Sequence, residues 1–252
     1  MSTCSQKVRL VLAEKKLEFE SVILDLQSGA QFESGYLKLN PQAVVPTLVH
    51  QDQAITESTL INEYLEDCYP KPSLLPKTAV ERYQLRAFCK QLDDRLHPAC
   101  GVITYAIGAR PGLLTKPKAE LAALIAQIPD EARRRHRAMV IQDGVHAPIF
   151  ATALAQYLQV LNFAEAQLAL TPFLAGTQLS LADYALTPYV LRLEHLAMNT
   201  VMDRYPALVA WHRAIQQRDS YHVAIENWLP KAAVAGFKAA GEAVIAEIRF
   251  PD

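Results

Sequence analysis

The chain of 252 residues is 51% hydrophobic and 20% charged, the balance of a globular protein that buries a core. Its formal net charge of -1 excludes a strong positive field that would attract nucleic acid or an anionic membrane. No apolar run reaches the roughly 18 to 20 residues of a transmembrane helix, and the N-terminus lacks the apolar core of a secretory signal. The four cysteines show no CxxC or metal-ligand spacing and are interpreted as reduced thiols, so we expect a cytoplasmic protein.

The first 76 residues alternate between helix and strand patterns. In chain order they predict a helix over 6–16, a strand over 19–26, a loop with a turn of helix over 27–40, short strands over 46–50 and 54–56, and a helix over 59–67. The two short strands flank a polar turn, which is typical of a hairpin. This order predicts an α/β domain with a mixed sheet.

The pattern changes at residues 69–77, which contain three prolines. Proline lacks an amide hydrogen and restricts the residue before it, so helices stop there, and we interpret this segment as an interdomain linker. After it the strand signal vanishes, and helices are predicted over 79–108, 117–127, 130–142, 147–170, 180–197, 206–217 and 231–248. The sequence therefore predicts two domains, an α/β domain at 1–76 and an all-helical domain at 77–252.

Three stretches of the first domain carry chemistry. Ser2, Cys4 and Ser5 lie at the start of a predicted helix, where hydroxyls cap free amides and the partial positive charge of the helix stabilises a thiolate. A cis peptide bond before Pro46 would turn the backbone of Val45 outward to pair with a peptide-like ligand. For the first stretch, plain helix capping is the alternative interpretation.

The third stretch is Glu57-Ser58, between a predicted strand and a predicted helix. Ser58 suits the N-cap of that helix, and the amides after it can hold a carboxylate. Glu57 beside them could accept from an ammonium group. The pair is a plausible clamp for an α-amino acid head, and helix capping is again the alternative.

Together these stretches resemble one family. The run SxCSxKVRLxLxEKxLxFE, followed by LNPxxxVPTL, ITES and INEYLED, resembles the N-terminal domain of the glutathione transferase superfamily over about the first 76 residues. The later run FLAGTQLSLADYALTPYV resembles the helical-domain motif of the same family. Its Ser180 and Asp183 form an S-x-x-D capping box and are interpreted as folding residues. The resemblance implies a thioredoxin-like domain followed by an all-α domain.

The resemblance also implies site residues. Ser2 stands where serine-type members place the hydroxyl that activates glutathione, and Cys4 and Ser5 are neighbouring candidates for this role. The implied glutathione contacts are a backbone pair from Val45 beside a cis Pro46, a clamp on the γ-glutamyl head from Glu57 and Ser58, and a contact to the glycyl carboxylate from Gln31.

Two departures from the family pattern stand out. Val44 occupies a position where the family often has glutamine or lysine, so one side-chain contact to glutathione is missing. The family also places a central strand before the serine motif, whereas Ser2 follows directly after Met1. A sheet without this strand would leave its neighbours unpaired, so we expect that roughly ten upstream residues are omitted and that the site could be compromised.

The resemblance implies a cytoplasmic, homodimeric detoxification enzyme that transfers glutathione to a small hydrophobic electrophile. Alternatives are glutathione-dependent cleavage of β-aryl ethers, to which residues 128–149 are loosely similar, non-catalytic binding of glutathione or a hydrophobic ligand, and monothiol exchange through Cys4. The run Arg133–Arg137 could face an anionic group, but a solvated helix face is preferred. Tyr105 is a candidate pocket residue. The seven histidines, His97 among them, show no metal-ligand clustering and are interpreted as surface or packing residues.

Overall fold

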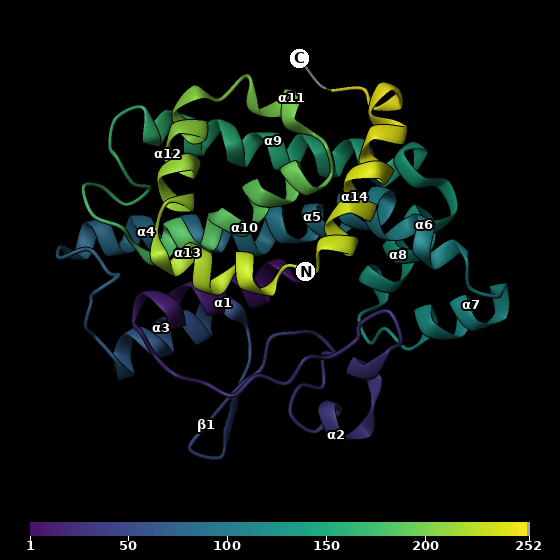
Figure 1. Cartoon of the computed structure of the whole chain (residues 1–252), viewed down its shortest axis with the longest axis horizontal. Coiled ribbons are helices and arrows are strands. Elements are labelled where there is room, and N and C mark those ends of the chain that lie inside the picture. Colours follow the sequence, from purple (N-terminus) through teal and green to yellow (C-terminus); the bar gives the residue numbers. More distant parts are fainter. Residues whose placement is uncertain (251–252) are drawn as a thin grey trace.

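The computed structural model describes residues 1–250, and its first part packs below the remaining helices in Figure 1. This part contains α1 (Thr3–Glu14), a 3-10 turn η1 (Ala30–Phe32), α2 (Ser34–Leu37), β1 (Leu48–His50), β2 (Gln53–Ile55) and α3 (Ser58–Cys68). β1 pairs antiparallel with β2, with Val49 opposite Ala54. The predicted hairpin and the helices on either side of it are confirmed.

The strand predicted over 19–26 is wrong, because this segment has no regular secondary structure. Its apolar side chains Val22 and Ile23 are 86% and 81% exposed. A strand needs a neighbour for its backbone hydrogen bonds, and within residues 1–250 the β1–β2 hairpin is the whole sheet. The sheet is therefore smaller than the mixed sheet that the pattern predicts.

The proline-rich segment 69–77 runs without helix or strand and is tied to both parts of the molecule. The buried ammonium of Lys15, directly after α1, donates to the carbonyl oxygens of Tyr69 and Pro72 and pairs with Glu66 at 2.6 Å. The backbone amide of Leu181 donates to the carbonyl of Leu74 at 2.9 Å. These hydrogen bonds fix the segment against both parts of the molecule.

The rest of the described chain is helical, as predicted. Its helices are α4 (Ala79–Gln91), η2 (Leu92–Leu96), α5 (His97–Thr104), η3 (Tyr105–Ala109), α6 (Arg110–Leu114), α7 (Lys118–Ala126), α8 (Glu131–Asp143), η4 (Gly144–His146), α9 (Pro148–Leu168), α10 (Leu181–His195), α11 (Asn199–Met202), α12 (Pro206–Gln216), α13 (Asp219–Ala224), η5 (Glu226–Trp228), α14 (Lys231–Val244) and η6 (Ile245–Glu247). The sequence did not predict α6, α11 and α13. The helix predicted over 79–108 is interrupted by π-helical turns at η2 and η3.

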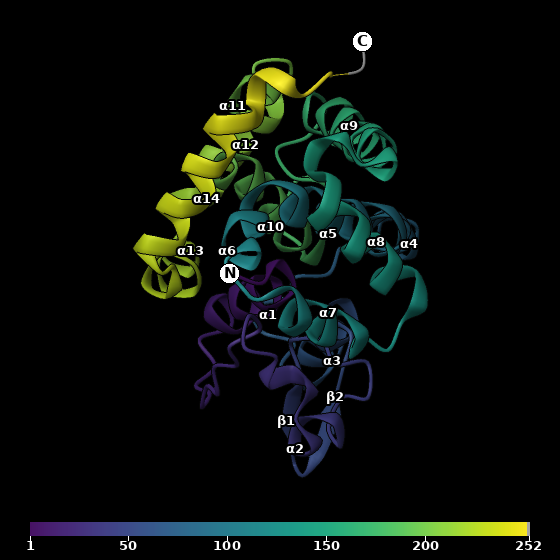
Figure 2. The same ribbon diagram turned by 90° about the vertical axis from the view of Figure 1, so that its right-hand side faces the viewer.

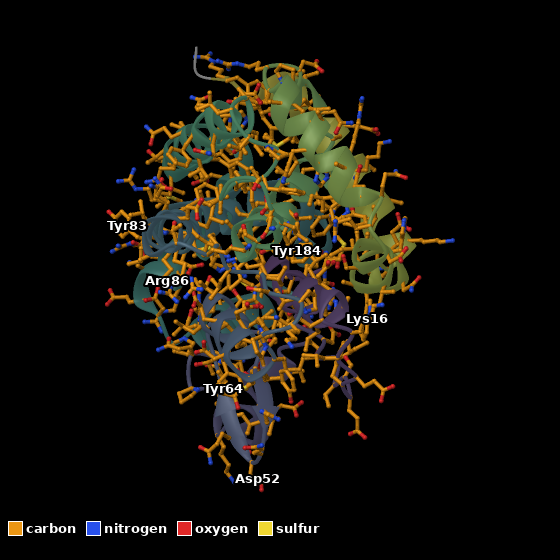
Figure 3. The ribbon with its side chains drawn as sticks, turned by 90° about the vertical axis from the view of Figure 1, so that its left-hand side faces the viewer. Lys16, Asp52, Tyr64, Tyr83, Arg86 and Tyr184 are labelled. Carbon is orange, nitrogen blue, oxygen red and sulfur yellow. The ribbon has the colours of Figure 1, made fainter. Side chains whose placement is uncertain are left out.

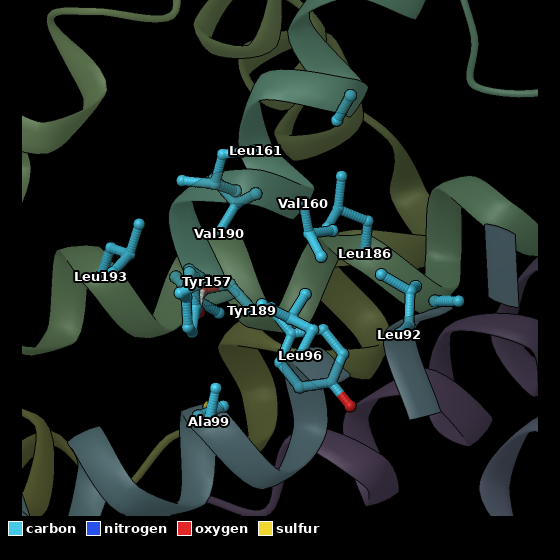
Figure 4. Packing of buried hydrophobic residues seen from close by; sticks show 14 of the residues in the cluster. Leu92, Leu96, Ala99, Tyr157, Val160, Leu161, Leu186, Tyr189, Val190 and Leu193 are labelled. Carbon is cyan, nitrogen blue, oxygen red and sulfur yellow. Dashed lines mark hydrogen bonds between the residues drawn. The ribbon is translucent and has the colours of Figure 1, made fainter. Parts of the chain in front are cut away.

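Helix α10 forms the centre of the core. Figure 4 shows its side chains packed against α9 and η2, with Tyr157, Leu161 and Val190 among the buried residues. The capping box at its start is confirmed, since the Asp183 carboxylate accepts from the amide and hydroxyl of Ser180. Asp183 also accepts from the amide of Leu174 and the indole of Trp211. These contacts agree with the interpretation of both residues as folding residues.

Helix α1 lies between the two parts. It packs against α3 on one side and against α10 and α13 on the other. The Glu14 carboxylate, at its C-terminal end, accepts hydrogen bonds from Tyr184 on α10 and from Arg218 beside α13. In Figure 3, Tyr184 lies in the interior between the two parts, while Asp52 marks the tip of the hairpin. The element with the predicted chemistry therefore sits at the junction.

Helix α14 runs along one side of the helical part (Figure 2). Its Gly241 lies against the carbonyl of Leu196, which follows α10. No single helix within residues 1–250 is long and apolar enough to cross a membrane, although α8 with η4 and α9 reach that length and composition together across an 86° bend.

Candidate active site

A cavity of about 1540 Å³ opens between the two parts of the molecule. One wall comes from the start of α1, the segment 17–27 and the loop around Pro46, and the other comes from α5, η3, α7, α8 and α14. Five of the predicted site residues line it: Ser2, Ser5, Gln31, Val45 and Pro46. Binding sites commonly lie in such clefts between domains.

The start of α1 forms the first functional element of this cavity. Ser2 has an extended backbone, and its hydroxyl accepts a hydrogen bond from the amide of Ser5 at 3.2 Å. The helix has no acidic residue in its first turn, so its partial positive charge is not neutralised from within. An anionic sulfur placed in the cavity beside Ser2 would therefore be stabilised.

The loop at Val45–Pro46 forms the second element. The peptide bond between these residues is cis, as the sequence predicts. The carbonyl of Val44 accepts from the Tyr36 hydroxyl at 2.6 Å and from the Asn40 amide at 2.8 Å, which fixes the loop. The backbone of Val45 is thus held at the cavity wall in a fixed conformation.

Of the remaining predicted site residues, Gln31 lines the cavity, whereas Glu57 and Ser58 at the start of α3 are not among its lining residues. Gln31 is buried at the cavity wall, and its side-chain oxygen has no hydrogen-bond partner among the described residues. Glu57 has a left-handed backbone, with φ of 64°, and is itself the N-cap of α3, so the predicted cap at Ser58 shifts by one residue. Ser58 is the first residue of α3 and is buried. The orphaned oxygen of Gln31 leaves this residue able to contact a ligand.

Cys4 lies on α1 next to a histidine from the helical part. Its Sγ is 3.5 Å from Nδ1 of His97, the first residue of α5. Burial raises the pKa of Cys4, but the charge and hydrogen bond of His97, with help from Lys7 and Ser58, outweigh it and lower this pKa to about 6. The negative charge of Cys4 in turn raises the pKa of His97. Each group of the pair therefore favours the charged form of the other, a thiolate at Cys4 and an imidazolium at His97.

Sequence reasoning missed His97. His97 is exposed, which agrees with its interpretation as a surface residue, but it also contacts Cys4 and lines the cavity, which the sequence did not predict. The Tyr189 hydroxyl lies 3.2 Å from the same ring nitrogen and helps to orient the imidazole. The two partners are 93 positions apart in the chain, so no local motif could have joined them.

Buried charges on α1 support this pair. The fully buried Lys7 donates to the Asp93 carboxylate at 3.1 Å and lies 5.2 Å from the centroid of the Tyr189 ring. Thr59 on α3 donates to the same Asp93 oxygen. The cation of Lys7 favours a thiolate at Cys4. Among the residues that the structure describes, no group of His, Cys, Asp and Glu is arranged to hold a metal ion.

Comparison with known families assigns both parts of the chain. Residues 1–68 match the family model described as glutathione S-transferase, N-terminal domain. Residues 131–219 match the model described as glutathione S-transferase, C-terminal domain. The two matches cover the start of α1, the cis-proline loop and α10.

The names of individual relatives indicate several different activities. The chain is 31% identical to glutathione S-transferase 3 of Zea mays over 219 residues, 85% of each chain. It is 30% identical to the tetrachloro-p-hydroquinone reductive dehalogenase of Sphingobium chlorophenolicum over 239 residues, 90% of this chain and 94% of the relative. The structure resembles the β-etherase LigF from Sphingobium sp. strain SYK-6 with a TM-score of 0.81 at 26% identity, covering 89% of this chain and 95% of the other. The fold is thus shared among proteins with different reactions.

Proposed function

Because this chain belongs to the glutathione S-transferase family, we propose that it binds reduced glutathione and transfers its sulfur to a hydrophobic electrophile. The observation that carries the proposal is that the start of α1 and the cis Val45–Pro46 bond line one cavity. The start of α1 stabilises a thiolate, and the backbone of Val45 can form hydrogen bonds with a peptide.

In this reaction the ligand lies along the cis-proline loop. The amide and carbonyl of Val45 pair with its cysteinyl unit, Glu57 and Ser58 hold the γ-glutamyl head, and Gln31 contacts the glycyl carboxylate. Its thiol loses a proton and is held as a thiolate by the Ser2 hydroxyl and the start of α1. The thiolate then attacks an electrophilic carbon, a carbon–sulfur bond forms, and a halide or aryloxide leaves with the bonding electrons. Holding both reactants close together in one cavity further accelerates the reaction.

The test measures binding and chemistry separately. Calorimetry with reduced glutathione should give a 1:1 heat of association, and turnover should be measured with aryl halides, aryl ethers and isothiocyanates. Ser2→Ala should lower kcat by about tenfold or more through a raised thiol pKa, while Cys4→Ser should cost less. Absence of heat on mixing with glutathione would remove the proposal. Binding without turnover of any electrophile would leave a non-catalytic ligand-binding protein.

The Cys4–His97 pair supports a second candidate function, thiol–disulfide exchange. The Cys4 thiolate would attack the glutathionyl sulfur of a mixed disulfide between glutathione and another thiol, take up the glutathionyl group and release the other thiol. A reduced glutathione thiolate would then attack the Cys4–glutathione disulfide, regenerate Cys4 and release oxidised glutathione. A relative named reductive dehalogenase is consistent with redox use of this scaffold.

Mass spectrometry separates the two candidates. Incubation with oxidised glutathione should add one glutathionyl group to Cys4 if exchange operates, and Cys4→Ser should then abolish turnover while Ser2→Ala retains it. The reverse order of losses supports transfer through Ser2. An adduct on the exposed Cys68 instead would count against a special role for Cys4.

The likeness to the β-etherase LigF supports aryl ethers as one electrophile class within the transfer reaction. Attack of the thiolate at the carbon that bears the ether oxygen would release a phenol, which can be measured directly. We also propose a cytoplasmic homodimer. Sedimentation velocity of the purified chain tests the assembly, and a single monomeric species would exclude it.

A further inference from the structure

Two arginines of α8 line the cavity on the side of the helical part. Arg133 and Arg137 are four residues apart, so their side chains project from the same face of the helix. Both are half-buried, whereas Arg135 between them is exposed and lies outside the cavity. The interpretation of this run as a solvated face therefore holds for Arg135 but is wrong for Arg133 and Arg137.

Within residues 1–250 neither guanidinium forms an ion pair with a carboxylate, although the charge of Asp130 acts on Arg133 and raises its pKa against the effect of burial. Arg133 donates to the backbone carbonyl of Gln42 at 2.9 Å, and Arg137 lies over the Tyr105 ring, 2.9 Å from its centroid. The acidic residues that line the cavity are Glu18, Glu20, Asp25 and Asp130. Within residues 1–250 none of them forms an ion pair with either arginine, and Asp130 accepts from the backbone amide of Arg133 to cap α8.

The aromatic ring beneath Arg137 belongs to an apolar cluster. Tyr105 packs with Phe237, Leu121 and Ile125 on a small cluster that includes Leu113. Burial lowers the pKa of Arg137, which shows that its charge is poorly solvated there. A half-buried cation without a counter-charge raises the free energy of the empty site, and an anion beside it would offset this cost.

We propose that Arg137 and Arg133 form a subsite for a carboxylate, or a similar planar oxyanion, on an aromatic electrophile. This inference rests on the proposed function, since it names the class of second substrate. The guanidinium fork matches such a group with two parallel hydrogen bonds, and the apolar cluster around Tyr105 would hold the ring. The substrate class is therefore an aromatic acid rather than a neutral hydrophobe.

Glutathione also carries a carboxylate, on its glycyl end. Arg133 is bonded to Gln42, three residues before Val45, and so lies nearer to the loop proposed for glutathione. Arg137 is one helical turn further along α8 and is stacked on Tyr105, which belongs to η3 of the helical part. This placement favours the electrophile as the source of the anion, and the experiment below distinguishes the two sources.

The experiment uses a matched pair of probes and three variants of the full chain. The probes are dinitrobenzoate and its methyl ester, which differ in charge and by one methyl group. Binding is measured by quenching of Trp228, which lines the cavity. The variants are Arg137→Gln, Arg133→Gln and the matched control Arg135→Gln. Thermal unfolding of each variant verifies the fold, and Arg137→Lys tests the geometry of the fork.

We expect Arg137→Gln to weaken dinitrobenzoate binding by about tenfold or more and to leave the methyl ester within about twofold. Arg133→Gln should act in the same direction, Arg137→Lys should restore part of the affinity, and Arg135→Gln should change neither probe. Equal losses for both probes, or no loss for the acid, would overturn the subsite.

The remaining measurements of this experiment are of catalysis and of glutathione binding. With a chlorodinitrobenzoate as electrophile, glutathione sulfur replaces chloride, and Arg137→Gln should lower kcat/KM for the acid about tenfold relative to its ester. If calorimetry instead shows that the variant loses affinity for glutathione while both probes bind as before, the anion is glutathione's own and the assignment is wrong. If the wild-type chain binds dinitrobenzoate through Arg137 but shows no glutathione-dependent turnover, the subsite stands and the transferase proposal falls.

Discussion

Single residues of this chain take their chemistry from neighbours that are distant in sequence. The thiol of an unperturbed cysteine has a pKa of about 8.5. In the folded chain the imidazole of His97, the ammonium of Lys7 and the hydroxyl of Ser58 lower the pKa of Cys4 to about 6 against the opposing effect of burial. The thiolate fraction therefore rises through pH 6 and is nearly complete at pH 7.

This environment predicts the behaviour of a variant without the imidazole. His97→Ala should raise the pKa of Cys4, because the largest favourable contribution to the thiolate is lost. Alkylation of Cys4 by iodoacetamide at pH 7, followed by mass spectrometry of each cysteine, should slow by about tenfold or more.

The exposed Cys68 serves as an internal control for that measurement, and its rate should not change. In the wild-type chain, alkylation of Cys4 should fall steeply below pH 6 as the thiolate takes up a proton. A Cys4 rate that is unaffected by His97→Ala would show that the pair does not control the thiol.

At the scale of elements, a glycine at a helix contact decides how closely the two chain segments can approach. A methyl group built on Gly241 of α14 would lie 1.8 Å from the backbone oxygen of Leu196. The backbone there has no flexible side chain that could move aside. The close approach of α14 to the end of α10 therefore requires glycine, and α14 supplies Ala233 and Phe237 to the cavity.

Gly241→Ala should destabilise the chain by about 1–3 kcal/mol, since overpacking forces the helix away from α10. Gly236 lies on the same helix with nothing within 4 Å of the position that a methyl group would take. Gly236→Ala should therefore stabilise by about 0.5–1 kcal/mol through better helix propensity. Denaturant unfolding of the pair gives the comparison, and equal effects of the two substitutions would contradict the close contact.

The start of α10 depends on one buried carboxylate. Asp183 is fully buried and accepts from Ser180, Leu174 and Trp211. Asp183→Ala leaves these donors without an acceptor and should cost about 2–4 kcal/mol, compared with about 1 kcal/mol for Ser180→Ala. Chemical denaturation measures the difference, and a shift in Trp211 emission should accompany the loss of its hydrogen bond. A cost for Asp183→Ala no larger than that of Ser180→Ala would count against this network.

At the scale of the whole molecule, α1 joins the two parts. Glu14 accepts from Tyr184 at 2.5 Å and from Arg218 at 2.6 Å, which connects α1 to α10 and to the start of α13. Burial raises the pKa of Glu14, but these hydrogen bonds outweigh it, so its pKa lies below the ordinary value. The carboxylate thus stabilises the folded chain above the unfolded pKa of about 4.3, and this contribution is lost as the pH falls through the lower folded value.

Glu14→Gln should therefore lower the free energy of unfolding by about 1–3 kcal/mol at pH 7. The difference from wild type should shrink as the pH falls below about 4, where the wild-type carboxylate also takes up a proton. Glu20→Gln, on an exposed residue, is the matched control and should have little effect at either pH. A difference that does not depend on pH would show that the charge is not the cause.

The sequence alone was sufficient for most of the local structure. The spacing of apolar residues predicted α1, α3 and the helices that follow the linker, and the prolines and turn residues predicted the hairpin and the linker. Each of these signals depends on a few consecutive residues, because helix periodicity, capping and turn chemistry act within one or two turns of backbone. The cis bond at Val45–Pro46 was implied by the resemblance to the family and not by the local sequence.

The segment 19–26 shows where local signals fail. Its apolar alternation favours a strand, but a strand needs a paired neighbour, and only the folded arrangement decides whether one is present. The same distinction between local signals and folded arrangement applies to the site residues. The run around Ser2 could be recognised in the sequence. The contact of His97 with Cys4 and the place of the two arginines of α8 beside the cavity were decided by tertiary structure, because burial and charge depend on residues that are distant in the chain, 93 positions apart for Cys4 and His97.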